Sequence, residues 1–400
     1  MQNKQDISHN LSDDLQFLIA CCQTNTSKKD TDFILNYLSE KDEAQYHNLI
    51  TLAAQHGILP LVHKTLQSLD SRHPELDSGS HSTLLTELKA HYMSISQRNM
   101  LMSAELIHIM KLLKENNIDA LAFKGPALSQ MAYGDITLRQ FGDLDILIRK
   151  KDRSKMMDLL LQERYIPEIN LKEGTKETFF NSVNVIGLHN KTSFVFVEMH
   201  WELLSKNYAI DWEEASLWEK KKSIQINNKN IAVLPIEQFL LYLCAHGSKH
   251  LFERLEWICD IDRTVRSTPD IDWIHLLKEA EKLGTKRMLC LGLALSQLFF
   301  YLKLPDMIQN EIKKDHELPK LISKVIKINF SEAAQKGKSY SSFGLLWSMR
   351  ENLSDQLRFA WRGLFAPKFD DFLFIQLPKH LTFLYPIVRP FRLVIKYFKH

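Results

Sequence analysis

The segment FGDLDILI, residues 141–148, places two aspartates inside an otherwise apolar run. A strand turns successive side chains to opposite faces, so Leu144 and Ile146 share one face while Asp143 and Asp145 share the other. Two carboxylates on one face repel each other, and they stay ionised together only where they are exposed to water or bridged by a cation. The chain must therefore fold so that this face forms either a solvated strand edge or a metal site.

The chain is long enough to bury a core around such a strand. Its 400 residues are 45% apolar and 25% charged, which is typical of a globular protein of two or three domains. The net charge of +3 is too small to indicate nucleic-acid binding by itself. The five cysteines form no CxxC pair and indicate no disulfide framework, which favours a reduced, cytoplasmic setting.

Two segments of the sequence bear on targeting and membrane insertion. The N-terminal residues are polar and lack the apolar core of a signal peptide. The most apolar run, residues 288–302, is shorter than the roughly 20 residues that a membrane span needs. We therefore expect a buried helix there.

Periodicity divides the chain into three regions. Apolar spacings of three and four predict a helical N-terminal region over residues 1–95. Residues 96–235 contain short strands, among them IDALAF and LDILI, and two hairpins that turn at HNKT and at a pair of asparagines. Helical spacing resumes after Pro235 and predicts a helical C-terminal region over residues 236–400. The expected fold class is α+β.

A third acid lies in the strand SFVFVEMHW. Here Glu198 and His200 fall on one face and Met199 on the other, so Glu198 is a carboxylate at the end of an otherwise apolar strand. If this strand neighbours the one that carries Asp143 and Asp145, three acids converge. Such an oxygen cage suits Mg²⁺, which takes its remaining ligands from water and substrate phosphates.

Four motifs follow one another in a fixed order: FKGPAL, LRQFGDLDILI, VEMHWEL and LCAHGSKHLFERLEWICDID. Over residues 95–265 this set resembles a bacterial family of mostly uncharacterised nucleotidyltransferase-like proteins, which have the DNA polymerase β-type palm. The resemblance implies a polymerase β-like palm that transfers a nucleoside monophosphate from an NTP to an acceptor hydroxyl with Mg²⁺ (or Mn²⁺). The acceptor could be a sugar, a small molecule, a protein side chain or an RNA end.

The resemblance also implies a role for each motif residue. Asp143 and Asp145 would bind the metal ions, and Glu198 would complete the cage and could accept the proton of the incoming hydroxyl. Three further residues would bind the nucleotide, Gly125 by letting the backbone approach the triphosphate and the two cations by binding phosphate: Lys124, Gly125 and Arg139. For Arg139 the alternative is a structural ion pair with one of the two aspartates.

Pro126 departs from the superfamily pattern, which usually has serine or glycine after the turn glycine. Proline offers a phosphate neither an N–H nor a hydroxyl. The competing hypothesis is therefore a catalytically degenerate palm that serves as a nucleotide-binding or scaffolding module.

The HGSKH segment places His246 and His250 on one helix face. A zinc-protease motif would require glutamate at the position of Gly247. One hypothesis is that this helix and the end of the acidic strand contact the substrate, through His200, His246, Lys249 and His250. The alternative is that the histidines only pack between the palm and the helices. A hydrolase centred on His246 and His250 would need a carboxylate outside the palm site.

The C-terminal stretch has basic residues, interleaved aromatic residues and no acid from residue 379 onward; the basic residues are Lys379, Arg389, Arg392, Lys396 and Lys399. Such a helix can bind an anionic membrane surface, or it can pack its apolar face on the domain. The sequence therefore predicts a cytoplasmic protein with weak contact to the inner membrane face as one option.

Overall fold

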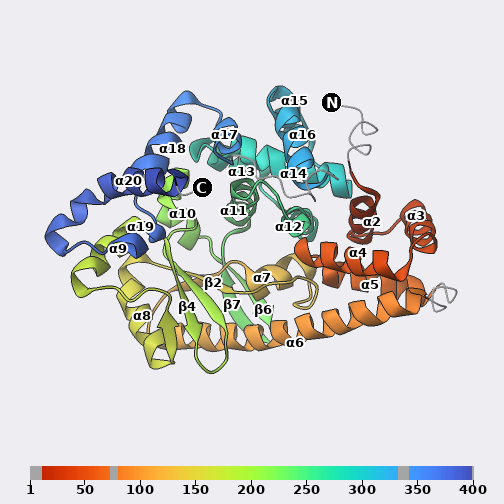
Figure 1. Ribbon diagram of the computed structural model, residues 1–400, viewed down its shortest axis with the longest axis horizontal. Helices are drawn as coiled ribbons and strands as arrows, with labels where there is room; N and C mark the ends of the chain where they lie inside the picture. The colour runs from red at the N-terminus through yellow and green to blue at the C-terminus, as the bar shows by residue number, and fades with distance from the viewer. Residues whose placement is uncertain (1–10, 73–79, 332–341, 399–400) are drawn as a thin grey trace.

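The computed structural model describes residues 11–72, 80–331 and 342–398 (Figure 1). It has an α+β fold, as the sequence predicts, with one seven-stranded mixed sheet flanked by helices. The strands are β1 (Ala120–Ala122), β2 (Leu144–Ile148), β3 (Tyr165–Pro167), β4 (Val185–Asn190), β5 (Phe196–His200), β6 (Lys222–Ile226) and β7 (Lys229–Val233).

The sheet has the order β3-β4-β5-β2-β1-β7-β6. Two of its pairings are parallel, β2 with β5 and β1 with β7, and the others are antiparallel. Both predicted hairpins are confirmed, because β4 pairs with β5 and β6 pairs with β7. Asn227 and Asn228, which turn the second hairpin, both have positive φ, a conformation that asparagine tolerates better than most residues.

Each face of the sheet contributes to a separate hydrophobic cluster. Leu144 and Ile146 of β2 cluster with Leu106 and Ile109 of the long helix α6 (Ser80–Glu115), which runs below the sheet in Figure 1. Short elements connect the strands: α7 (Gly125–Leu128), the π-helical turn η2 (Ser129–Tyr133), η3 (Lys150–Asp152), α8 (Arg153–Gln162), η4 (Glu173–Thr175), α9 (Lys176–Ser182), η5 (Lys206–Tyr208) and α10 (Glu214–Trp218).

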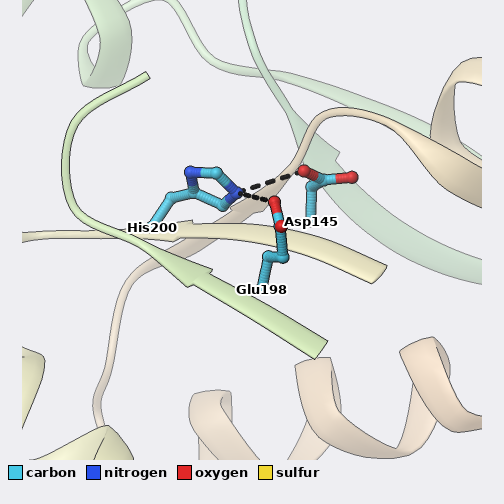
Figure 2. A group of neighbouring side chains, drawn as sticks. All are labelled: Asp145, Glu198 and His200. Carbon is cyan, nitrogen blue, oxygen red and sulfur yellow. Dashed lines mark hydrogen bonds and ion pairs between the residues drawn. The ribbon is translucent and has the colours of Figure 1, made fainter. Parts of the chain in front are cut away.

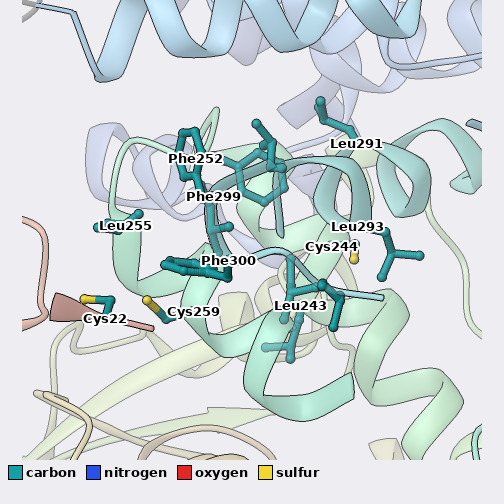
Figure 3. Close-up of a cluster of buried hydrophobic side chains, with 14 of the residues drawn as sticks. Cys22, Leu243, Cys244, Phe252, Leu255, Cys259, Leu291, Leu293, Phe299 and Phe300 are labelled. Atoms are coloured by element: carbon teal, nitrogen blue, oxygen red, sulfur yellow. The ribbon is translucent and has the colours of Figure 1, made fainter. Parts of the chain in front are cut away.

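The second cluster joins the sheet to helices from both ends of the chain. It contains Phe123 together with residues of the N-terminal helices and of the C-terminal helices that follow the sheet. Figure 3 shows part of it, where Cys22 of the N-terminal region lies near Cys259 and other buried side chains. The N-terminal helices are α2 (Asp13–Cys21), α3 (Lys28–Ser39), α4 (Glu43–Gln55) and α5 (Leu59–Asp70).

The chain after the sheet is helical, as predicted. The apolar run at residues 288–302 lies in a mostly buried helix as far as Phe300, and none of the described helices is long and apolar enough to cross a membrane. These helices are α11 (Ile236–Lys249), α12 (Leu255–Ser267), α13 (Trp273–Lys282), α14 (Lys286–Phe300), α15 (Asp306–Lys314), α16 (Leu318–Asn329), α17 (Ser342–Ser348), α18 (Leu353–Phe365), α19 (Phe369–Phe374), η7 (Lys379–Leu384) and α20 (Tyr385–Phe398). Lys399 lies outside the described residues, and the side chain of Lys396 is not described.

Candidate active site

The parallel pairing of β2 and β5 brings two acids together. Asp145 lies opposite Glu198 in the register, and directly opposed residues of neighbouring strands point to the same face. The next pair in the register, Ile146 and Met199, points to the other face and is buried in the cluster with α6. The apolar residues that alternate with the acids therefore hold the acids on one face.

His200 connects the two carboxylates (Figure 2). Its ring nitrogen Nε2 lies 3.1 Å from Oδ1 of Asp145 and 3.0 Å from Oε2 of Glu198. Burial disfavours a charged ring, but the hydrogen bonds to Asp145 and Glu198 outweigh it and raise the pKa of His200. Burial likewise disfavours the ionised form of Glu198, yet the hydrogen bond and charge of His200 lower the pKa of Glu198 to about 2.

Lys124 is a second cation in this cluster. It follows β1, which pairs with β2, and its Nζ lies 2.6 Å from Oδ1 of Asp145. Burial alone would lower the pKa of Lys124, but the charge of Asp145 and its neighbours raises it. The lysine therefore remains charged and partly neutralises the acids.

Asp143 lies one residue before β2, at the wall of the adjoining cavity. Burial raises the pKa of its carboxyl, and the nearby charge of Asp145 raises it further. The group whose ligand atoms all lie within 4.8 Å of one another consists instead of Asp145, Glu198 and His200. The structure thus brings two of the three predicted acids together, with a histidine between them and Asp143 beside them.

The donor set of this group fits a divalent cation. Oδ2 of Asp145 is buried and has no hydrogen-bond partner among the described residues, although a buried carboxylate oxygen normally has one. Carboxylate oxygens suit Mg²⁺ and Mn²⁺, and an imidazole nitrogen suits transition metals. A cation at this position would supply the interaction that Oδ2 of Asp145 lacks.

Asp143 and Glu198 line a cavity of about 550 Å³, a volume typical of small-molecule sites. Cations, carboxylates and aromatic rings share its wall. The polar and aromatic lining residues are Arg98, Lys124, Arg139, Gln140, Phe141, Asp143, Asn184, Glu198, His200, Ser205, Tyr242, His246, Lys249, His250, Arg254, Glu256 and Trp257.

The predicted nucleotide-binding residues differ in their surroundings. Gly125 is buried, with a φ of +52°, and a Cβ there would lie 3.0 Å from the carbonyl oxygen of Asp143. The local backbone therefore requires glycine at position 125.

Arg139 is buried and binds both carboxylate oxygens of Asp260, at 2.8 and 3.0 Å, and Glu256 at 3.0 Å. The alternative of an ion pair with Asp143 or Asp145 is replaced by an ion pair with helix α12.

The histidine helix α11 forms one wall of the cavity. The rings of His246 and His250 both pack against Trp257, with centroid distances of 5.5 and 5.0 Å. Burial lowers the pKa of both histidines, to about 4 for His250, and the nearby charges of Lys124 and Lys249 lower them further. Both rings are therefore neutral at pH 7.

Burial and Lys124 also lower the pKa of Lys249, which lines the same wall.

Sequence reasoning did not find several residues of the wall. Arg98 reaches the site from α6, where its Nη2 donates to the carbonyl of Gly142 at 3.2 Å. Tyr242 contributes from α11, and its hydroxyl lies 3.4 Å from Nδ1 of His246. Arg98 lies in the middle of a long helix without a motif, so no local signal could identify it.

A mixed sheet with a D-x-D strand, a third acid on the neighbouring strand and a polar cavity beside them defines the nucleotidyltransferase-like class of fold. Residues 42–301 match the family described as uncharacterised nucleotidyltransferase, and the chain belongs to that family. The resemblance inferred from the four motifs is thereby confirmed.

Comparisons with curated proteins and with solved structures add little to the family assignment. No curated protein matches the chain. Among solved structures, the chain is similar to an antigenic nucleotidyltransferase-like protein from Paracoccidioides brasiliensis, with 15% identity and a TM-score of 0.32 over 50% of this chain and 93% of that protein. This likeness is too weak to transfer structural detail.

Proposed function

We propose that the protein transfers a nucleoside monophosphate from an NTP to an acceptor hydroxyl, with Mg²⁺ or Mn²⁺ as cofactor. The observation that carries the proposal is the pair Asp145 and Glu198, which lie side by side with Glu198 at the wall of a polar cavity, while Oδ2 of the buried Asp145 has no hydrogen-bond partner among the described residues. The acceptor class stays open among sugars, small molecules, proteins and RNA ends.

In this proposal the acids hold the cation and the cavity holds the nucleotide. Asp145, Glu198 and Asp143 supply carboxylate oxygens, and His200 can supply a nitrogen once its proton has left. When bound, such a cation neutralises phosphate charge and activates the attacking hydroxyl. The charge of His200, or that of a cation in its place, keeps the pKa of Glu198 low, so we assign Glu198 the binding of positive charge and not proton acceptance.

In this proposal the cationic side chains of the cavity wall bind the phosphates. Lys124 and Lys249 line the cavity on different elements, and burial strengthens their attraction for a triphosphate. Arg98 and Arg254 add positive charge at the same wall. We leave Arg139 out of this set because its guanidinium is already bound by two carboxylates of α12.

A melting experiment tests the site. Mn²⁺ together with a non-hydrolysable NTP analogue should raise the melting temperature of the protein, because ligands that bind only the folded state stabilise it. The double variant Asp143→Asn, Asp145→Asn should lose this shift. Asp158→Asn, which changes an exposed aspartate of α8, is the matched control and should keep it. A double variant that responds like the parent would reject the metal site.

Turnover needs a separate experiment. Each labelled NTP should be incubated with the protein and a cell extract, and a labelled acceptor should appear only with the parent protein and the Asp158→Asn control. If no NTP labels any acceptor although the melting shift is present, binding without transfer is the correct description.

One specific observation favours the competing hypothesis, a catalytically degenerate palm that binds a nucleotide or acts as a scaffold without transferring a group. Lys124 and His200 already neutralise the acids without a metal ion, as an ammonium and an imidazolium would in a site that has lost its metal. The variant Lys124→Met separates the two cases. A catalytic lysine predicts loss of labelling in the variant, whereas a lysine that replaces the metal predicts tighter Mn²⁺ binding with no labelling in either protein.

A further inference from the structure

Helix α20 has its polarity inverted relative to a normal surface helix. Its two arginines face inward, where Arg389, only 3% exposed, lies 3.2 Å from the fully buried carboxylate of Asp371 and donates to the carbonyl of Gly363 in α18. Arg392 binds the same aspartate. Two of the basic residues for which the sequence predicted membrane contact as one option therefore form ion pairs inside the protein.

Several apolar side chains of α20 face outward, although Tyr385 is buried and Val388 packs against the cluster below the sheet. Ile387, Phe391 and Val394 follow one another at helical spacing, and all three are exposed, Phe391 by 68%. A globular helix normally turns such a stripe to the core. The ion pairs with Asp371 turn the two arginines toward the protein and leave the stripe largely exposed.

The neighbouring elements continue this apolar surface. Phe383 of η7 is 70% exposed, and Phe374 of α19 is also exposed. On α18, which packs against α20, Leu357 and Trp361 are exposed one turn apart, Trp361 by 66%. These helices lie together at one end of the molecule (Figure 1). Large contiguous apolar surfaces of this kind mark sites of interaction.

The exposed charges beside this surface are of both signs, with lysines in excess. Lys379 is exposed, and its backbone lies next to Gly174, a residue flanked by the exposed lysines Lys172 and Lys176. Of the exposed acids there, Glu177 follows Lys176, and Asp370 is already paired with Arg392 at 3.4 Å. From residue 379 to the C-terminus the sequence contains no aspartate or glutamate. Exposed aromatic and aliphatic side chains next to lysines match the boundary between acyl chains and anionic headgroups.

We propose that the end of the molecule formed by α18, α19, η7 and α20 docks on the surface of an anionic lipid bilayer. Phe383, Ile387 and Phe391 enter the headgroup–acyl boundary, and Lys172, Lys176 and Lys379 contact anionic headgroups. The inverted orientation of α20 favours a bilayer over a protein groove, because its side chains project outward from successive turns and form no concave seat.

Vesicle co-sedimentation tests the proposal with the full chain. The parent should pellet with vesicles of equal parts phosphatidylcholine and phosphatidylglycerol, and pure phosphatidylcholine should bind it about a hundredfold more weakly, since each of the three lysines near an anionic surface contributes about 1 kcal/mol. The double variant Phe383→Ser, Phe391→Ser should bind the mixed vesicles at least about tenfold more weakly, because it loses the two rings that the bilayer would bury. The control Met93→Ser, Ile274→Ser changes two side chains exposed elsewhere and should bind like the parent.

A second measurement does not depend on the double variant folding. Brominated lipids should quench part of the parent's tryptophan fluorescence, and Trp361→Phe should remove that part. Failure to pellet, equal binding to both vesicle types, or quenching that persists in Trp361→Phe would overturn the proposal. So would a dimer in light scattering that binds no vesicles, because the surface would then join two copies of the chain.

Discussion

Gly125 shows how a single residue supports the site. Its positive φ directs the chain from Lys124 into α7, and its Cα lies against the carbonyl of Asp143. Alanine would be strained in this conformation and would press on that carbonyl. We expect Gly125→Ala to lower the free energy of unfolding by about 1–2 kcal/mol from the conformation alone, and by more from the close contact.

Urea unfolding followed by circular dichroism measures this effect. Gly134→Ala is the matched control, because Gly134 also has a positive φ, of 70°, but a Cβ there would meet nothing within 4 Å. Equal losses in the two variants would show that the contact with Asp143 has no energetic weight.

At the same scale, sequence reasoning was most informative where it depended on strand alternation. The pattern set Asp145 and Glu198 apart from their apolar neighbours, and the structure places them opposite each other. The partner of Arg139 could not be found in this way, because Asp260 lies 121 positions away and meets the arginine only through the packing of α12. A tertiary ion pair leaves no local pattern.

At the scale of elements, Arg139 holds α12 against the segment before β2. Removing it would leave Asp260 and Glu256 buried and close together without their shared cation. Arg139→Met should therefore lower the free energy of unfolding by about 3–5 kcal/mol, as measured by urea unfolding. The control Arg98→Met removes an exposed arginine of the same cavity and should change it by less than about 1 kcal/mol. Similar losses would contradict the structural role of Arg139.

His56 connects α4 to α12 and makes stability depend on pH. Its Nδ1 accepts a hydrogen bond from the backbone of Leu255, and burial, aided by the charge of Arg254, lowers its pKa to about 4. Between pH 6.5 and 4 the unfolded chain binds a proton at this ring that the folded protein does not. The free energy of unfolding should therefore fall across this window, by up to about 3 kcal/mol from His56.

The variant His56→Asn keeps an acceptor but cannot titrate, so the fall in stability from pH 6.5 to 4 should become shallower. Part of the fall should persist, because His250 is shifted in the same direction. His47→Asn, on the exposed side of α4, is the control and should keep the slope of the parent. An unchanged slope in His56→Asn would assign the pH dependence to other groups.

Sequence patterns located most elements, because hairpins and amphipathic helices depend on short-range spacing. The two asparagines between β6 and β7 and the apolar run of α14 are examples. The orientation of α20 was beyond such reasoning. Its apolar stripe is visible in the sequence, but the buried Asp371 that turns the arginines inward is a tertiary feature.

At the scale of the whole molecule, the N-terminal helices share one hydrophobic cluster with the helices that follow the sheet, as far as α18. Gln23 donates to the carbonyl of Phe299 at 2.9 Å, and Arg263 donates to that of Cys22 at 2.9 Å. The division at residues 95 and 235 stays a prediction about sequence regions. We expect a chain that begins at residue 80 to melt at a lower temperature and to bind a hydrophobic dye, because α11, α12 and α14 would lose their apolar cover.

Adding residues 1–79 as a separate polypeptide should restore the melting temperature at least in part. A shortened chain that melts like the parent and binds no dye would show that the N-terminal helices are energetically independent.

The placement of the acids on two parallel neighbours has a practical consequence. Asp145 and His200 are 55 positions apart, and the long connection from β2 to β5 ends in the β4–β5 hairpin, whose turn contains the exposed residues Lys191 and Thr192. A chain split between these two residues would carry Asp145 on one fragment and Glu198 with His200 on the other. In the proposed metal site neither fragment would hold the cation alone, so recovery of Mn²⁺ binding on mixing would serve as a complementation reporter for the joining of β2 to β5.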